Sequence, residues 1–256
     1  MRIEPDMAAI LPSAVPARGL GVVSLVKRFG RNRALDGLSF QVDKGEVVGL
    51  FGRDGAGKTT CFEAIMGLIG IDAGEIWMDG RDVTGRTVDQ RAPLGLGYLP
   101  QQPSVFSGMT TAQNIAAVLE HTQPDQALRH QRLEDLLEIF SIGYVRDVPS
   151  QKLSGGERRR CEVARSMASA PSIMLFDEPF AGIDPMSVNS IKDVIRRLKD
   201  MGVGVLMADQ NVHEALDVVD RACVIHFGRL IFDGSPQAML SDPDVRELYL
   251  GAEFAG

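Results

Sequence analysis

The sequence predicts an α/β fold with a parallel central sheet, an antiparallel β flank and an inserted α-helical subdomain. A glycine-rich loop at residues 52–60 follows a short apolar stretch and precedes a helical one. After residue 170, apolar strands alternate with helical segments, which is typical of parallel sheets with crossover helices. Between these parts, residues from roughly 87 to 165 have mostly helical periodicity.

Residues 1–51 are predicted to form a flexible extension, the strands of the antiparallel flank and one central strand. Residues 1–18 are rich in proline and alanine and lack periodicity, so we expect a flexible extension. Gly21–Phe29 and Leu38–Val42 have strand composition at hairpin-like spacing, which predicts the antiparallel flank. Glu46–Phe51 is apolar on both faces, as a buried central strand requires.

The helical insertion interrupts a sheet that resumes near residue 170. One apolar stripe at helical spacing is formed by Leu128, Leu133, Leu136, Leu137 and Phe140. Three later strands are predicted at Ser172–Phe176, Val203–Ala208 and Ala222–His226, separated by helices near 187–200 and 211–219. The expected domain limits are one domain over 19–256, with a sheet lobe of 19–100 and 166–240, a helical subdomain of about 101–165 and a C-terminal helix over 241–256.

Composition excludes several classes of function. The net charge is −7 and no tract is polybasic, which disfavours nucleic-acid binding and electrostatic attachment to an anionic membrane. No apolar run approaches the roughly 20 residues that span a bilayer, so we expect no direct membrane insertion. The three scattered cysteines predict buried thiols in a reducing compartment. These features predict a cytoplasmic protein.

The segment from Gly52 to Thr60 matches the pattern G-x-x-x-x-G-K-[ST] of a phosphate-binding loop. Glycines allow successive backbone N–H groups to face one anion, and the following helix adds the positive end of its dipole. Lys58 supplies charge to the β- and γ-phosphates, and the Thr59 hydroxyl is a ligand for Mg²⁺. The predicted phosphate contacts are Gly52, Arg53, Asp54, Gly55, Ala56, Gly57, Lys58, Thr59 and Thr60. The predicted cofactors are therefore ATP and Mg²⁺.

Two adjacent carboxylates, Asp177 and Glu178, end an apolar strand. A carboxylate at this position is suited to hold Mg²⁺ through water, which is the role predicted for Asp177. Glu178, one residue further, is suited to accept the proton of an attacking water molecule. An acidic loop without a chemical role is the alternative. The catalytic candidates are Glu178 as base and Lys58 as phosphate ligand.

The segment Leu153-Ser154-Gly155-Gly156-Glu157 resembles the signature motif of the ABC ATPase family. That resemblance implies a P-loop NTPase core of ABC type. It also implies a head-to-tail dimer with a second copy of the chain, in which Ser154, Gly155 and Gly156 contact the nucleotide held by the other copy.

Further motifs extend this resemblance over nearly the whole chain from about residue 20. Gln101 matches the glutamine loop, which implies contact with Mg²⁺ and with a membrane partner, and Asp184 matches the D-loop. Phe29 matches the aromatic residue that stacks on adenine, although a core position is its alternative. Permease subunits are expected to dock near Gln101–Phe106; a place in the lobe core is an equal alternative for Phe106.

Three longer stretches are similar to the ATPase of the lipopolysaccharide-export machine: residues 178–185, 211–217 and 242–251. This similarity implies a homodimer under transmembrane subunits, on the cytoplasmic face of a bacterial inner membrane. ATPases of branched-chain amino-acid importers are related and are the alternative. A third class, ABC proteins acting on ribosomes or DNA, is disfavoured because the chain has one motif set and no sustained heptads.

Two positions depart from the family pattern. Gln210 stands where a histidine usually contacts the γ-phosphate, and its amide cannot become cationic or relay a proton. Asp54 stands where Asn or Ser is usual, so a carboxylate lies near the triphosphate and, in the family's dimer, near the partner copy's D-loop. Both departures predict a slow ATPase, with Gln210 still counted among the catalytic residues. A binding-only subunit is the rival prediction.

Overall fold

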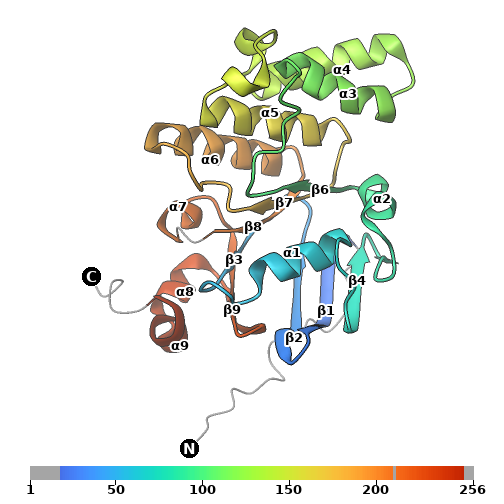
Figure 1. The fold of residues 1–256 in the computed structure, drawn as a ribbon. Coiled ribbons are helices and arrows are strands. Elements are labelled where there is room, and N and C mark those ends of the chain that lie inside the picture. Colours follow the sequence, from blue (N-terminus) through green and yellow to red (C-terminus); the bar gives the residue numbers. More distant parts are fainter. Residues whose placement is uncertain (1–17, 210–211, 251–256) are drawn as a thin grey trace, which may run out of the picture.

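The computed structural model describes residues 18–209 and 212–250 (Figure 1). All but the last residue of the predicted flexible extension lie outside this range, and so does Gln210. No helix in the described ranges combines the length and the apolar character needed to cross a bilayer. The domain limits predicted from the sequence stay predictions.

The smaller sheet is the predicted antiparallel flank. Its strands are β1 (Leu20–Phe29), β2 (Asn32–Val42), β4 (Ala73–Met78) and β5 (Arg81–Asp82), in the order β2-β1-β4-β5. Every pair in it is antiparallel. Strand β2 begins six residues before the predicted Leu38, because its polar first half still pairs with the end of β1.

The larger sheet is mostly parallel, as predicted, and runs in the order β10-β9-β3-β8-β7-β6. Its strands are β3 (Val47–Phe51), β6 (Leu96–Leu99), β7 (Ile173–Asp177), β8 (Gly204–Ala208), β9 (Arg221–His226) and β10 (Arg229–Gly234). Within the described part of this sheet, the pair of β9 and β10 is antiparallel and the other pairs are parallel. The sequence did not predict β6, because a four-residue strand interrupted by Gly97 has no measurable alternation.

Helices cover both faces of the larger sheet (Figure 1). They are α1 (Lys58–Met66), α2 (Val88–Arg91), α3 (Thr111–Thr122), α4 (Gln126–Ile139), α5 (Gly155–Met167), α6 (Pro185–Asp200), α7 (Val212–Leu216), α8 (Pro236–Ser241) and α9 (Pro243–Val245). We call α3, α4 and α5 the helical layer; α6 lies between it and the sheet (Figure 1). One buried apolar cluster joins the sheet to α5 and α6, and a second joins the other face to α1 and the flank.

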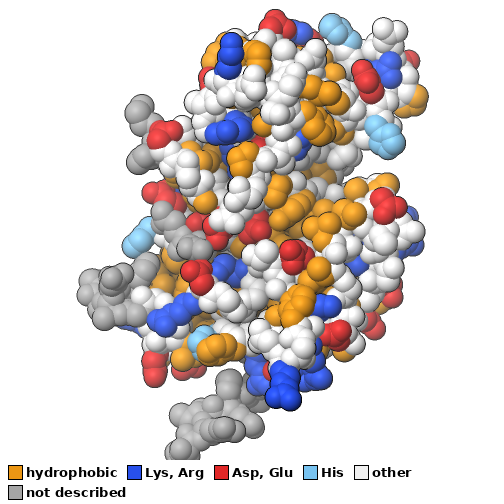
Figure 2. All heavy atoms as spheres, viewed as in Figure 1, with side chains coloured by type: hydrophobic (Ala, Val, Ile, Leu, Met, Phe, Trp, Pro, Cys, Tyr) orange, Lys and Arg blue, Asp and Glu red, His pale blue; other side chains and the backbone are white. Residues whose placement is uncertain are grey.

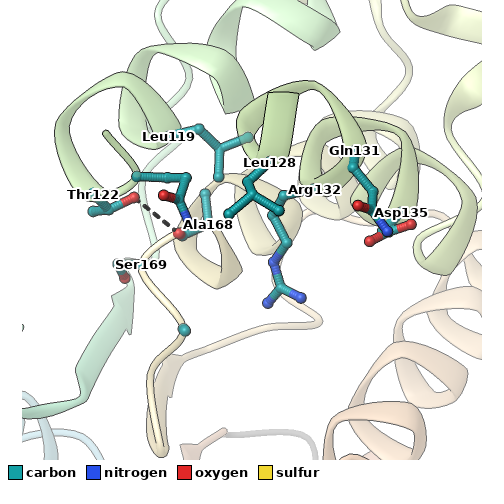
Figure 3. A pocket seen from close by; sticks show the side chains of 10 residues that line it. Leu119, Thr122, Leu128, Gln131, Arg132, Asp135, Ala168 and Ser169 are labelled. Atoms are coloured by element: carbon teal, nitrogen blue, oxygen red, sulfur yellow. Dashed lines mark hydrogen bonds between the residues drawn. The ribbon is translucent and has the colours of Figure 1, made fainter. Parts of the chain in front are cut away.

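The expectation that Leu128 belongs to a buried apolar stripe on α4 is wrong. Leu136, Leu137 and Phe140 are buried, but Leu128 is 50% exposed. Leu128 lines a hollow of about 350 Å³ between α3, α4 and the end of α5, where the Thr122 hydroxyl donates to the Ala168 carbonyl at 3.2 Å (Figure 3). None of the predicted nucleotide-site residues lines this hollow.

The C-terminal region is built from short segments rather than one long helix. Ser235 caps α8 and Asp242 caps α9, each followed by a proline at the first helical position. A π-helical turn over Arg246–Leu250 follows. The described part of the predicted helix over 241–256 is therefore broken at Asp242, and residues 251–256 lie outside the described ranges.

Candidate active site

The glycine-rich loop leaves buried strand β3 and enters helix α1 at Lys58. A Cβ atom on Gly52 would lie 2.5 Å from the Ile225 carbonyl oxygen, and one on Gly57 would lie 2.6 Å from that of Ala34. Both glycines also have positive φ angles, 155° and 112°. Only glycine fits at these positions, so local sequence chemistry fixes the path of the loop.

The start of α1 offers donors to an anion. Gly57 caps the helix without a side-chain hydrogen bond, so the first N–H groups of α1 lack a capping side chain. The Lys58 ammonium group donates to the carbonyl oxygens of Gly52 at 2.6 Å and Arg53 at 3.3 Å. Burial lowers the pKa of Lys58, and the charges of Asp54 and then Glu178 oppose this effect.

The two predicted carboxylates lie at the end of strand β7, where Asp177 is the last strand residue and Glu178 follows it. Asp177 is 5% exposed and accepts a hydrogen bond from the Tyr98 hydroxyl at 3.3 Å. Burial raises the pKa of Asp177, while the bond from Tyr98 and the charge of Lys58 act in the opposite direction. Tyr98, on the unpredicted strand β6, is a site residue that sequence reasoning missed.

Glu178 has a backbone conformation that is rare outside glycine, with φ of 46°. Its N–H group donates to the Ala208 carbonyl on neighbouring strand β8 at 2.7 Å. Its carboxylate accepts a hydrogen bond at 2.5 Å from the side-chain amide of Gln101, a residue 77 positions earlier in the chain. Strained backbone is frequent at functional sites, and here it carries the predicted base.

The predicted magnesium ligands are chemically suited to the ion. Thr59, Gln101 and Asp177 offer a hydroxyl, an amide and a carboxylate oxygen, and oxygen is the ligand that Mg²⁺ prefers. Asp177 and Glu178 both act on the pKa of Lys58, so the carboxylates and the phosphate loop share one electrostatic environment. Among the described residues, no cluster of three His, Cys, Asp or Glu side chains could hold a metal by itself. This small ligand set suits an ion that is completed by phosphate oxygens.

The signature segment begins helix α5 with a capping box. The Ser154 hydroxyl accepts from the Glu157 N–H at 3.3 Å, and the Glu157 carboxylate accepts from the Ser154 N–H at 2.8 Å. The side-chain and backbone bonds from Ser154 lower the pKa of Glu157. A Cβ atom on Gly156 would lie 2.8 Å from the Ser187 hydroxyl on α6, so this glycine permits close helix packing.

A buried charged network, which sequence reasoning missed, ties α5 to strand β7 and to the segment after Gln101. Arg159 is 6% exposed and donates to the carbonyl oxygens of Pro100 at 2.7 Å and Asp177 at 3.3 Å. Glu162 pairs with Arg159 at 3.3 Å and accepts from the Ser104 N–H at 2.5 Å. Burial lowers the pKa of Arg159, and the charge of Glu162 opposes it.

A second arginine of α5 holds the same segment. Arg165 donates to the Ser104 carbonyl at 2.6 Å, and its guanidinium lies 4.8 Å from the centre of the Phe106 ring. Phe106 is 48% exposed, so its alternative as lobe core is wrong, whereas partly buried Val105 packs against the core. The spacing of Arg159 and Glu162 among apolar residues of a predicted helix was a signal for such a network.

Phe29 and Asp184, which were predicted as site residues, come from other elements of the fold, and Asp209 is the described neighbour of Gln210. Phe29 ends β1, is 50% exposed and has the Lys27 ammonium 5.3 Å from its ring centre. Asp184 is exposed before α6, where its carboxylate accepts from the Ser187 N–H at 3.0 Å. Asp209, directly before Gln210, is 3% exposed and accepts from the Phe180 N–H at 3.3 Å.

Comparisons with known proteins agree with this arrangement. Residues 35–181 match the family model described as ABC transporter, and residues 229–255 match one described as branched-chain amino acid ATP-binding cassette transporter. A probable ABC transporter ATP-binding protein of Azorhizobium caulinodans is 50% identical over 92% of this chain and 84% of its own length.

Two further relatives are informative. The lipopolysaccharide export system ATP-binding protein LptB of Acidithiobacillus ferridurans is 48% identical over 90% of this chain and 96% of its own length. A crystal structure of the ADP conformation of an ATP-binding cassette of an ABC transporter superposes with a TM-score of 0.81 at 27% identity, over 91% of this chain and 98% of that one. With the phosphate loop, the paired carboxylates and the signature helix in one fold, this chain belongs to the family of ABC transporter ATP-binding subunits.

Proposed function

We propose that this chain hydrolyses ATP to drive lipopolysaccharide export, as a dimer of identical copies bound to transmembrane partners. One observation carries the enzymatic part of the proposal. Lys58, Asp177 and Glu178 converge at the carboxyl ends of the central strands, where the charges of both acids act on the pKa of the lysine. This is the charge arrangement that phosphoryl transfer requires.

The phosphate loop binds and orients the triphosphate in this proposal. Lys58 exchanges its bonds to the loop carbonyls for bonds to phosphate oxygens, and the N–H groups at the start of α1 add further donors. Thr59, Gln101 and Asp177 hold Mg²⁺, which supplies positive charge at the phosphates when bound. Phe29 stacks on the adenine ring, and its half-exposed side chain supports that role.

Glu178 is the proposed general base. It accepts a proton from water as the water oxygen bonds to the γ-phosphorus, and the bond from that phosphorus to the β–γ bridging oxygen breaks to release ADP. The amide of Gln101 donates to the same carboxylate at 2.5 Å and therefore competes with the water. We infer that this contact opens before the proton is transferred.

A second copy of the chain completes each site in this proposal. The exposed Ser154 begins a helix of 13 residues, whose first turn can add donors to the phosphates held by the other copy. Gly155 and Gly156 let this turn approach closely, and the exposed Asp184 lies one turn before Ser187 on the neighbouring helix α6. The head-to-tail arrangement brings these elements to the partner's phosphate loop.

Transmembrane permease subunits are proposed to dock near Gln101–Phe106, at the cytoplasmic face of the bacterial inner membrane. Phe106 is half exposed, and its ring contacts the guanidinium group of Arg165. Figure 2 shows apolar side chains at the surface between the helical layer and the rest of the molecule. Lipopolysaccharide is favoured as cargo because LptB relatives are 43–48% identical over about nine-tenths of the chain. The C-terminal family match over residues 229–255 favours the alternative, a branched-chain amino-acid importer.

Complementation tests the proposed cargo. We expect the chain to restore growth to Escherichia coli depleted of its own LptB, because the two proteins are 44% identical over 96% of that LptB. The control is a parallel assay of leucine uptake in cells that lack their importer ATPase. Restored uptake without restored growth, from a chain that hydrolyses ATP in the purified state, would replace export by import.

The Gln210→His substitution is expected to raise the turnover rate. A histidine can become cationic and so stabilise the γ-phosphate during transfer, which the glutamine amide cannot do. We expect an increase of about tenfold, which is smaller than the roughly 10²–10⁴-fold contribution of a positioned acid–base group because the glutamine amide can already donate a hydrogen bond. Steady-state ATPase assays measure it, with Gln131→His, a change in α4, as the control. An unchanged rate would mean that position 210 does not limit the reaction and would direct attention to Asp54.

A further inference from the structure

Phe227 is both exposed and conformationally unfavourable. Its side chain is 77% exposed, more than that of any other large hydrophobic residue in the described ranges. It forms, with Gly228, a two-residue turn between β9 and β10, closed by the pair of His226 and Arg229. Both turn residues have positive φ angles, 47° and 77°. Such turns favour Asn-Gly, and a bulky residue in this conformation is an outlier.

The turn is fixed directly to the phosphate loop. The Gly228 N–H donates to the Ala56 carbonyl at 2.9 Å, and the Gly228 carbonyl accepts from the Asp36 N–H at 2.9 Å. A Cβ atom on Gly228 would lie 2.6 Å from the Ala34 carbonyl oxygen, the same distance as one on Gly57. The turn, the loop and the first half of β2 therefore meet at Ala34.

Phe29 comes from the other hairpin at this meeting point. It pairs with Asn32 at the tip of the β1–β2 ladder, and Asn32 is two residues before Ala34. Phe29 and Phe227 are thus two exposed aromatic rings on hairpins that both adjoin the phosphate loop. Phe106 and Tyr144, which are also exposed, belong to the segment after Gln101 and to a turn after α4.

We propose that Phe227 is a second aromatic contact for the purine base of the nucleotide whose phosphates bind the glycine-rich loop. The inference rests on the proposed nucleotide-binding function and adds a base-binding residue to it. A purine has two apolar faces and an edge, and contact with an aromatic ring removes exposed surface from both groups. Base binding thus accounts for an aromatic side chain at a turn position where Asn would be less strained.

The test separates the base from the phosphates. Binding of Mg²⁺–ADP and of Mg²⁺–pyrophosphate is measured by calorimetry for the full chain and for Phe227→Ala and Phe227→Tyr. We expect Phe227→Ala to weaken ADP binding about tenfold, in line with stacking contacts to bases, and to leave pyrophosphate binding unchanged. Phe227→Tyr keeps the ring and is expected to bind ADP as the native chain does. Leu128→Ala, which removes a half-exposed apolar side chain from α4, is the control.

A third variant distinguishes binding from turn geometry. Phe227→Asn places a residue favoured in this turn, so we expect a higher melting temperature without nucleotide together with weaker ADP binding. Unchanged ADP affinity in Phe227→Ala and Phe227→Asn would overturn the inference, and so would equal losses for ADP and pyrophosphate. If the native chain bound neither ligand, the proposed function itself would fail, and this inference with it.

Discussion

Replacing Glu178 with Gln is expected to lower the rate of ATP hydrolysis by a factor of about 10²–10⁴, the contribution of a positioned general base. The amide keeps the size of the side chain but cannot accept the proton of the attacking water. ATP binding is expected to persist, because the phosphate loop and Lys58 are unchanged. Steady-state phosphate release and calorimetric ATP binding measure the two effects separately.

Glu138→Gln is the matched control for this prediction. Glu138 is an exposed glutamate of α4, remote from the phosphate loop in the fold, so the same change there should leave turnover intact. A Glu178→Gln variant with native turnover would contradict the role of Glu178 as base. A variant that loses ATP binding as well would assign Glu178 to the binding site rather than to the chemical step.

Glu162→Gln is expected to be the most destabilising single change among those considered. It leaves Arg159, 6% exposed, without the carboxylate that neutralises it. Removing one partner of a buried ion pair costs about 3–5 kcal/mol, because the other charge stays buried and uncompensated. The loss should appear as a lower denaturation midpoint in urea with an unchanged slope.

A surface pair offers the comparison. Glu134 and Arg146 form two bonds, at 2.9 and 3.0 Å, yet their side chains are 42% and 40% exposed. Glu134→Gln should therefore cost less than about 1 kcal/mol, since water screens exposed pairs. Equal costs for Glu134→Gln and Glu162→Gln would show that burial does not set the energy of the Arg159 pair.

The sequence predicted the parts of the site whose chemistry is local. The phosphate loop is one uninterrupted segment that ends at Lys58, and Asp177 and Glu178 are neighbours at the end of one apolar strand. Their backbone geometry follows from glycines and from the end of a buried strand, so residue type and order were sufficient. The antiparallel flank was predicted for the same reason, since a hairpin is local.

Features that depend on packing between distant segments were not predicted. Strand β6 is too short to show periodicity and exists because it pairs with β7. Leu128 fits an apolar stripe, but α4 packs through its second half and leaves this residue at a hollow. The contact of Gln101 with Glu178 joins residues 77 positions apart, and Phe227 stands out only once its turn is placed on the phosphate loop.

The hydrogen bond between Gln101 and Glu178 bears on how much ATP a cell would lose to surplus subunits. While the amide donates to Oε2 of Glu178, that oxygen is occupied and only the rest of the carboxylate can accept a proton from water. The segment after Gln101 is also anchored to α5 through Ser104, so a movement of this backbone is coupled to α5. On the proposed function, copies made in excess of their membrane partners would hydrolyse ATP more slowly than copies in which this contact has opened, so overproducing this subunit would consume less of the nucleotide pool than the number of copies implies.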